Sequence, residues 1–559
     1  MSDDTLVMSD DTLVSALARA ARRPSGLDFL DARERAVHLP FAELHGRARR
    51  AAAALREAGV KRGDRVALVI GTSPAFVDAF FGCEIAGAIP VPMSPPLRLG
   101  RLDEYWSATA AAVDRVRAVA LIAESRVRRL LGTVVARASL PLGVHEAETL
   151  ARPGRRVPPF HDEPAPDDIA FIQLSSGSTR EPSPVPLRHR EILANIDAFV
   201  AEFGDPEANR GLSWLPLHHD MGLIGGLGGA VRAGRPLALL PPEVFLARPA
   251  AWLRAVSRHR ATVSPAPDFA YALAAERVRD DELEGVDLSS WTFALDGAEP
   301  ICADALRAFA RRFERWGFRP ESLTPVYGLA EAALAVSFSD ASKAFVTRRF
   351  DGDALGREEA REGEERGIEL VGVGRPLPGY EVELRDARGA PVHEGRVGRI
   401  WVRGPSVSQA VLTARGVTDG WLDTGDRGVR VGGELFVTGR DKDVVVVRGR
   451  KHPPEPLERA CNAVVGVRKG CAVAFGDLGE DGRERVVVLV ESREPPRDLA
   501  PACREAIAAA TGVAVDRVDV LAPGTLPRTT SGKLRRREAR EQWRRGSLAP
   551  PRKVSRARV

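Results

Sequence analysis

Apolar residues in the first half of the chain fall into short runs that alternate with helical patterns. RVALVI at 65–70 and IAFIQL at 169–174 predict buried strands, and RVRAVALIAES around 115–125 predicts another. A helix is predicted from Ser73, with a serine N-cap followed by proline, and a second over RHREILANIDAFVAEF, residues 188–203. Repeated strand and helix order predicts parallel sheets covered by helices.

The pattern changes after residue 380. YEVELRD, RVGRIWVRG, GGELFVTGR and DVVVVRGR are short strand patterns separated by glycine turns, which favours antiparallel or barrel-like structure. The last 110 residues or so mix apolar strand runs with helical patterns and predict a small α+β domain after Asp443. The stretch 340–367, with clustered Arg, Glu and Gly, predicts an exposed insertion or loop outside the core.

Length and composition indicate a globular chain with several packing units. At 559 residues it exceeds one hydrophobic core, and about 150 residues per domain gives three or four units. No apolar run reaches the roughly 18 residues of a membrane span. MSDDTLV at 1–7 recurs at 8–14, so we expect residues 1–14 to be a disordered, duplicated start that does not direct export. The five cysteines lack CxxC spacing, and we expect reduced thiols and a cytoplasmic protein.

The positive charge is concentrated at the end of the chain. Residues 535–559 hold ten Arg or Lys against two Glu, a net charge of +8. The whole chain has a net charge of +5, so the remaining residues carry −3. Such a tail could contact nucleic acid or an acidic protein, and a solvated terminus is the simpler alternative. We therefore do not infer DNA binding. Only seven of the 81 basic residues are lysine, so a lysine inside a chemical motif is informative.

The strongest local signal is LSSGSTREP at 174–182, which directly follows a predicted strand. Glycine can adopt positive φ, and the small hydroxyl residues offer side-chain and backbone donors, which is what a phosphate-binding loop needs. The candidate phosphate-binding residues are Ser175, Ser176, Gly177, Ser178 and Thr179. This loop is not a GxxxxGK[ST] sequence, and such a turn considered alone is more often a plain loop.

Further motifs follow in a fixed order. They are SWLPLHHDMGLIGG, SPAPDFAYAL, DGAEPI, VYGLAEAAL, GWLDTGDRG, GELFVTGRDKDVVVVRGRKH and LPRTTSGKLRRR. Together with the loop they closely resemble the superfamily of acyl-CoA synthetases, nonribosomal peptide adenylation domains and luciferases. HHDMGLIGG, SPAPDFAY, DGAEPI and YGLAEA resemble its fatty acyl-AMP ligase branch, over residues 25 to 540 or so.

This resemblance implies a nucleotide site. Asp426 matches the acid that accepts hydrogen bonds from the ribose hydroxyls, and Arg440 matches a ribose or phosphate contact. Tyr327 matches the aromatic residue that stacks on adenine, and Glu331 matches the acidic residue that holds magnesium. The same motifs add a group of nucleotide-binding candidates: Asp296, Gly297, Ala298, Glu299, Pro300 and Gly328.

Two lysines and one histidine complete the implied machinery. Lys533 matches the C-terminal lysine that bridges the substrate carboxylate and the α-phosphate, and Lys442 falls at the interdomain hinge. His219 matches a histidine at the mouth of the acyl pocket, where we assign it position and not proton transfer. The glycines of GLIGGLGGA, residues 222–230, could leave room for an acyl chain or allow close packing.

Three features depart from the family pattern. Most relatives continue the phosphate loop with Pro-Lys-Gly, whereas this chain reads Pro182-Ser183-Pro184, so no loop lysine can contribute. Residues 408–419 are shorter than the usual segment and lack its aromatic-Asn pair. Lys451 stands where fatty acyl-AMP ligases typically have Asn, and we expect activity to survive these changes.

The resemblance predicts an α/β fold with a large N-terminal domain, residues 15–441, of two helix-covered β-sheets plus a small distorted β-barrel. A mobile α+β domain, residues 442–540, carries Lys533, and residues 541–559 form a basic tail. The implied activity uses ATP and magnesium to convert a fatty acid to acyl-AMP, then loads the phosphopantetheine thiol of an acyl carrier protein. The alternatives are an acyl-CoA ligase that uses free CoA and a non-catalytic nucleotide-binding relative.

Overall fold

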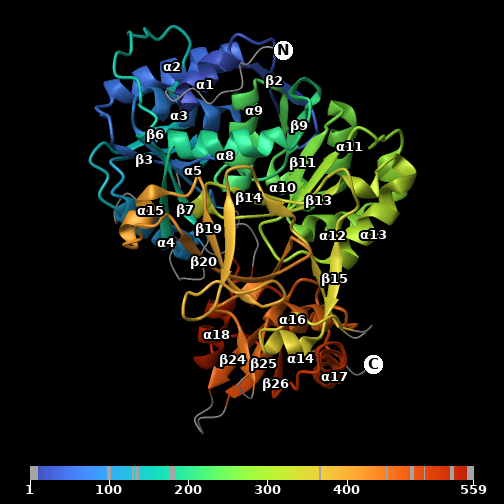
Figure 1. Ribbon diagram of the computed structural model, residues 1–559. Coiled ribbons are helices and arrows are strands. Elements are labelled where there is room, and N and C mark those ends of the chain that lie inside the picture. The colour runs from blue at the N-terminus through green and yellow to red at the C-terminus, as the bar shows by residue number, and fades with distance from the viewer. Residues whose placement is uncertain are drawn as a thin grey trace, which may run out of the picture.

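The fold was obtained as a computed structural model and combines helix-covered sheets with smaller antiparallel units (Figure 1). The structure describes residues 11–96, 102–128, 131, 138–175, 183–363, 367–447, 450–478, 484–496, 498–528 and 534–550. No helix in these ranges is both long and apolar enough to cross a membrane.

A nine-stranded sheet forms the centre of the large part. Its interior strands pair in parallel, and antiparallel strands close both edges. From one edge to the other the strands are β17 (Arg375–Pro376), β14 (Ala335–Phe338), β13 (Leu323–Gly328), β12 (Phe293–Asp296), β11 (Val263–Ala266), β9 (Gly211–Ser213), β10 (Leu237–Leu239), β1 (Gly26–Leu30) and β2 (Ala36–Pro40).

A second, parallel sheet has the order β4-β3-β5-β6, and an antiparallel hairpin, β7-β8, adds to this part of the fold. Their bounds are β3 (Arg65–Val69), β4 (Ile89–Met93), β5 (Ala120–Ala123), β6 (Val144–Glu146), β7 (Ile169–Ser175) and β8 (Ser183–Arg188). The predicted strands at 65–70 and 169–174 are therefore confirmed. The run at 115–125 divides into the end of a helix and a shorter strand, because only Ala120–Ala123 pairs with β3.

Helices cover both sheets, as the apolar patterns predict. The α-helices of this part are α1 (Leu13–Ala20), α2 (Phe41–Glu57), α3 (Pro74–Ile85), α4 (Leu102–Val116), α5 (Ser125–Arg128), α7 (Ala147–Leu150), α8 (His189–Ala201), α9 (Gly229–Ala233), α10 (Pro242–Ala247), α11 (Ala250–His259), α12 (Asp268–Arg277) and α13 (Ala303–Phe313). α2 and α3 pack so closely that a Cβ at Gly82 would lie 2.7 Å from the Cβ of Ala51. A second core around Trp252, Trp291 and Phe309 fills the space between α11, β12 and α13.

The predicted distorted barrel is wrong. The strands after residue 380 form an open antiparallel sheet with the order β18-β19-β20-β21, and β18 and β21 do not pair with each other among the described residues. The bounds are β18 (Glu381–Arg385), β19 (Gly398–Arg403), β20 (Leu422–Val431) and β21 (Glu434–Arg440), with α15 (Gln409–Ala414) between β19 and β20. The strand patterns predict antiparallel pairing, but they carry no signal for whether the sheet closes into a barrel.

Two predicted disordered or exposed segments are partly ordered. The stretch 340–367 contains β15 (Thr347–Phe350) and α14 (Gly352–Gly356), and Phe350 and Leu355 are buried with Val429 and Phe436. At the start, Thr12 caps α1, while Leu13 and Val14 are buried. Both expectations therefore fail for these residues, because a few apolar side chains within charged sequence are enough to anchor a segment.

The C-terminal part, which we take as residues 443–550, mixes sheet and helix as predicted. It consists of β22 (Val445–Val447), β23 (Arg450–His452), α16 (Pro454–Asn462), β24 (Ala472–Leu478), β25 (Glu484–Glu491), α17 (Leu499–Thr511), β26 (Arg517–Leu521) and α18 (Arg536–Arg544). β25 pairs with β24 and β26 to make a three-stranded sheet. Figure 1 shows α14 of the segment 340–367 beside α16 and α17, away from the large sheets.

Candidate active site

Three of the predicted nucleotide residues, Tyr327, Asp426 and Arg440, come together where the large sheet meets the open antiparallel sheet. Tyr327 lies near the end of β13, next to the end of β12, which carries Asp296. Asp426 and Arg440 face each other as a register pair of β20 and β21. Residues that are about 100 positions apart in sequence are thus brought into hydrogen-bond contact.

Tyr327, Asp426 and Arg440 form one connected group. The Tyr327 hydroxyl donates to Asp426 Oδ2 at 2.8 Å, and Arg440 Nε donates to Asp426 Oδ1 at 3.1 Å. Burial raises the pKa of Asp426, and Arg440 and the Tyr327 hydroxyl act against that rise. A carboxylate oxygen can accept more than one hydrogen bond, so Asp426 retains capacity for a ligand's hydroxyl groups.

Glu331 lies beside this group on a short 3₁₀ turn, Ala330–Ala332. Its backbone carbonyl accepts a hydrogen bond from Ser408 N at 2.8 Å, and its carboxylate lies 3.7 Å from an Arg415 guanidinium nitrogen. Buried Asn195 holds the next strand by exchanging hydrogen bonds with the backbone of Ala335. Asn195 and Ser408 carry no local signal in the sequence, because their partners are distant along the chain.

The glycine of the YGLAE motif is required by close backbone approach. A Cβ at Gly328 would lie 1.7 Å from the Leu334 carbonyl oxygen, where no side chain fits. A Cβ at Gly297 would likewise meet Val326, with its Cγ2 at 2.7 Å. Ala298 has φ +68°, and such a conformation in a non-glycine residue often marks a functional site.

Asp296 is placed differently from a solvent-facing ligand residue. Its side chain is fully buried, and burial together with the Asp268 and Glu299 carboxyl groups raises its pKa well above the usual range. Burial and Glu299 also raise the pKa of Asp268 to about 7. Glu299 accepts a hydrogen bond from Phe269 N, so this acidic group joins the DGAEP motif to α12. The contact of Asp296 with nucleotide stays a prediction.

His219 lies just before the π-helix Met221–Gly228. Its carbonyl accepts a hydrogen bond from Leu223 N in that helix. The adjacent His218 carbonyl accepts from Gln173 of β7 at 2.8 Å, so this segment is tied to the strand that leads into the phosphate loop. A Cβ at Gly222 would lie 2.3 Å from the Pro216 oxygen. Close packing therefore explains this glycine, which favours the second of the two alternatives at that position.

Several predicted residues lie outside the described ranges. They are Ser176, Gly177, Ser178, Thr179 and Lys533. Ser175 ends β7 opposite Ser183 of β8, so the strands on both sides of the phosphate loop form an antiparallel hairpin. Lys442 is exposed in the turn that follows β21. The structure thus places the flanks of the loop and the predicted hinge.

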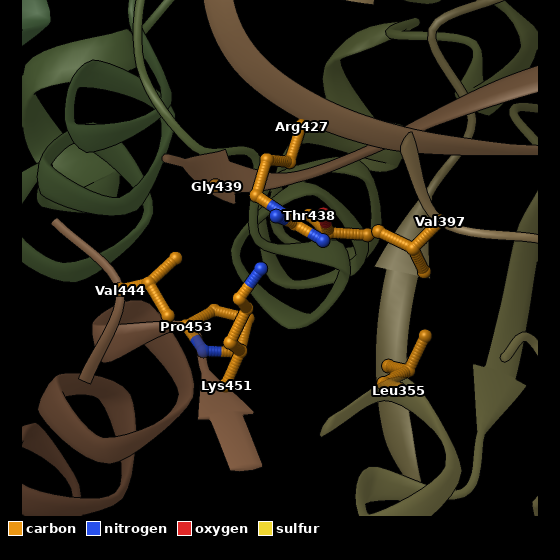
Figure 2. Close-up of a pocket in the computed structure, with 8 residues that line it drawn as sticks. All are labelled: Leu355, Val397, Arg427, Thr438, Gly439, Val444, Lys451 and Pro453. Atoms are coloured by element: carbon orange, nitrogen blue, oxygen red, sulfur yellow. The ribbon is translucent and has the colours of Figure 1, made fainter. Parts of the chain in front are cut away.

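A small cavity lies where the segment 340–367, the open sheet and the C-terminal part meet. Figure 2 shows Lys451 and Arg427 pointing toward each other there, with Leu355 and Val397 on another side. Both cations bind Glu358 Oε1, at 2.9 Å for Lys451 and 2.7 Å for Arg427. At about 20 Å³ the cavity has room for little more than a water molecule. It is therefore a junction and not a substrate pocket.

The described residues contain no group of three or more His, Cys, Asp or Glu side chains suited to hold a metal ion. Magnesium often binds through one or two carboxylates together with substrate phosphates. The Glu331 carboxylate is partly exposed at the site and has no hydrogen-bonded partner within 3.5 Å in the described structure, so it fits that role.

Known proteins resemble this chain over most of its length. The sequence model of AMP-binding enzymes matches residues 17–412. The chain is 36% identical to a Caulobacter vibrioides protein named "Putative acyl-CoA synthetase", over 98% of both chains. It is 33% identical to the long-chain-fatty-acid–AMP ligase FadD26 of Mycobacterium marinum, over 93% of this chain and 94% of that one.

Solved structures give the same result. One from a study of fatty acyl-adenylate ligases of E. coli and L. pneumophila has a TM-score of 0.89 and 35% identity, covering 96% of this chain and 98% of that one. A fatty acyl-adenylate ligase from L. pneumophila, in complex with acyl adenylate and pyrophosphate, has a TM-score of 0.74 and 28% identity, with 97% coverage of both. The predicted family resemblance is confirmed.

Proposed function

The chain belongs to the AMP-binding enzyme family, and we propose that it activates a fatty acid as acyl-AMP and then transfers the acyl group to the thiol of an acyl carrier protein. The observation that carries this proposal is the contact of Tyr327, Asp426 and Arg440 beside Glu331. The similarity to fatty acyl-AMP ligases along nearly the whole chain supports the fatty acid as substrate.

In the first half-reaction a fatty carboxylate oxygen attacks the α-phosphorus of ATP, and the bond to pyrophosphate breaks. Asp426 accepts hydrogen bonds from the ribose hydroxyls, and Tyr327 and Arg440 hold the Asp426 carboxylate in place. Lys533 offsets the negative charge on the fatty acid carboxylate and the α-phosphate. The reaction needs no protein nucleophile, so catalysis rests on positioning and electrostatics. His219 lines the entrance to the acyl site.

Magnesium would bind Glu331 and supply positive charge against the triphosphate. The protein's own contribution is to fix Glu331 through Ser408 and through Asn195, which anchors the following strand. The 408–419 segment departs from the family pattern, yet its first residue performs this positioning.

In the second half-reaction a phosphopantetheine thiol attacks the acyl carbonyl carbon and AMP leaves. We propose that residues 442–540 form a mobile domain that turns about Lys442 between the two reactions, which its exposed position in a turn permits. Carrier proteins are acidic, and the basic tail at 541–559 is suited to attract them.

Two alternative functions are each favoured by a specific observation. A conventional acyl-CoA ligase would share the site, and one relative carries an acyl-CoA synthetase name. A non-catalytic relative is motivated by Pro182-Ser183-Pro184 and the altered 408–419 segment. Comparing thioester formation with free CoA and with carrier protein distinguishes the proposed function from an acyl-CoA ligase. Pyrophosphate exchange distinguishes it from a non-catalytic relative.

Lys533→Ala tests the proposal. We expect adenylate formation to fall by two or more orders of magnitude, about the scale of losing one preorganised contact to developing charge. ATP–pyrophosphate exchange with a panel of fatty acids measures it, and Lys343→Ala is a control because Lys343 is exposed and pairs only with nearby Asp340 among its described contacts. Exchange by Lys533→Ala at the wild-type rate would contradict the assignment of this lysine.

A further inference from the structure

A triphosphate needs cations, and the loop that should bind it lacks a lysine. The sequence from Arg180 to Pro184 reads Arg-Glu-Pro-Ser-Pro, so the usual Pro-Lys-Gly continuation is missing. Backbone amides and hydroxyls can bind phosphate oxygens, but they carry no net charge to offset the phosphates. A cation near the site is needed to supply that charge, and Arg180 of the loop itself lies outside the described residues.

Arg415 lies between two motifs of the candidate site. Its guanidinium donates to the Asp423 carbonyl at 3.2 Å, just before the turn that carries Asp426. Another of its nitrogens lies 3.7 Å from Glu331 Oε1, which is beyond hydrogen-bond distance. The side chain is 47% exposed, so the guanidinium has room to turn toward a bound anion.

The backbone that carries Arg415 is firmly held. It follows α15, and its N–H donates to the Val411 carbonyl at 3.0 Å. At the other end of α15, the Ser408 hydroxyl donates to the Pro186 carbonyl at 2.6 Å, and Gln409 N donates to buried Glu191 at 2.9 Å. Pro186 belongs to β8, the strand directly after the phosphate loop. One helix therefore connects the phosphate-loop hairpin with the Glu331 side of the site.

Neighbouring arginines are engaged by closer acidic partners. Arg440 donates to Asp426. Arg427 binds Glu358 and Asp441, at 2.7 and 3.0 Å. Arg399 binds Asp423 and Asp441, at 3.2 and 2.5 Å. Of these four arginines of the described structure, Arg415 has the longest carboxylate contact and is the most available to an anion.

We propose that Arg415 binds the β- and γ-phosphates of ATP in place of the lysine that the loop lacks. This inference rests on the proposed adenylating function. It also gives a role to the 408–419 segment, which carries Arg415 directly after α15. Because pyrophosphate contains the same two phosphates, Arg415 would hold the leaving group as well as the substrate.

Nucleotide binding to the full-length protein tests this inference without requiring turnover. Calorimetric titration compares ATP with AMP, which lacks the two phosphates, for wild-type protein, Arg415→Gln and Arg415→Lys. We expect Arg415→Gln to weaken ATP binding about tenfold or more, as for loss of a charge-assisted hydrogen bond. AMP binding should change less than about twofold, and Arg415→Lys should recover part of the loss because it keeps the charge.

Arg403→Gln is the matched control. Arg403 is also about half exposed, at 45%, and it pairs with Glu381 in the same open sheet. This variant should bind both nucleotides like the wild-type protein. Equal ATP affinity for Arg415→Gln and wild type, or an equal loss for ATP and AMP, would overturn the role of Arg415. Wild-type protein that binds ATP yet exchanges no pyrophosphate with any fatty acid would instead overturn the proposed function.

Discussion

Two buried carboxyl groups on α3 differ in their partners: Asp78 is paired with an arginine, and Glu84 has no basic side chain beside it except His189 among its described contacts. Asp78 accepts from Arg47 Nε at 2.9 Å and from Arg47 Nη2 at 2.6 Å, so an ion pair holds it. Glu84 is 1% exposed, and His189 Nε2 lies 3.4 Å from its Oε2. Burial raises the pKa of Glu84 well above its usual range and lowers the pKa of His189 to about 4. Burial therefore favours the neutral form of both side chains of the second pair.

Glu84→Gln should preserve or increase stability, since glutamine reproduces the shape of a protonated glutamate. A raised pKa gives stability that is present below the unfolded value and is lost as pH rises toward the folded value. The wild type therefore loses stability relative to Glu84→Gln as pH increases from about 4.5. Thermal unfolding midpoints of both proteins at pH 5, 7 and 9 should show this growing difference, and titration of His189 is common to both.

Asp78→Asn is the control on the same helix. It removes the ionised partner of Arg47, so its unfolding midpoint should drop at every pH above 5, as for a broken buried ion pair worth about 3 kcal/mol or more. If Glu84→Gln lowered the midpoint as much as Asp78→Asn, Glu84 would have to be an ionised partner of His189.

At the scale of elements, α18 is fixed by its first residue. The Arg536 guanidinium contacts Asp443 at 2.7 Å, Glu458 at 2.9 Å and Glu455 at 3.2 Å. Asp443 follows the predicted hinge residue Lys442, and Arg536 lies three positions after Lys533. One buried cation therefore ties the segment next to the hinge, α16 and the segment that carries Lys533.

Arg536→Gln should destabilise the C-terminal part and lower adenylate formation together. Three carboxylates would lose their shared cation, at a cost of about 3 kcal/mol or more. Thermal unfolding and pyrophosphate exchange measure the two effects. Arg537→Gln is the control, because Arg537 is 61% exposed and pairs only with Glu541 among its described contacts. Wild-type behaviour of Arg536→Gln in both assays would show that the three acids need no common partner.

Elements with a continuous apolar signal could be predicted from the sequence. Apolar residues run without a break through residues 66–69 of β3 and are interrupted only by Gln173 in β7, and the helix pattern after Ser73 appears as α3. The segment 340–367 was misjudged because its buried residues, Phe350 and Leu355, are isolated among charged ones. The open form of the sheet β18-β19-β20-β21 was missed because closure depends on strand tilt and register.

Motifs located the site, while its supports could not be predicted. Tyr327, Asp426 and Arg440 stood in recognisable motifs and lie in contact. Asn195 contacts Ala335 across 140 residues, and Glu358 meets Lys451 across 93. Such pairings follow from the packing of elements, for which a single sequence carries no local signal.

At the scale of the whole molecule, the segment 340–367 joins the C-terminal part to the open antiparallel sheet. Glu358 receives Lys451 from one side and Arg427 from the other, and Asp353 pairs with Arg450 at 2.7 Å. Arg427 also binds Asp441, next to the predicted hinge. If the C-terminal part turns between the half-reactions, the contacts to Arg450 and Lys451 must break. On the proposed function, we expect them to favour the present arrangement over the one that accepts a thiol.

A preference for the present arrangement would affect which thiol the protein uses, free CoA or that of a carrier protein. Free CoA offers little surface to offset the lost contacts, whereas a docked carrier protein offers much more. Deleting the segment would expose Val429 and Phe436, so single substitutions are the better test. Lys451→Gln breaks the contact between the parts and leaves Glu358 paired with Arg427.

We expect Lys451→Gln to raise acyl-CoA formation two- to fivefold or so, the scale of one partly exposed ion pair, and Lys451→Gln with Arg450→Gln to raise it further. Adenylate formation should stay at the wild-type rate, because neither residue contacts Tyr327, Asp426 or Arg440 in the described structure. The assay supplies ATP, magnesium and a fatty acid with either CoA or phosphopantetheinylated carrier protein. Lys343→Gln, within the same segment, is the control. Rapid acyl-CoA synthesis by the wild-type protein, unchanged in both variants, would contradict the bias and favour the acyl-CoA ligase alternative.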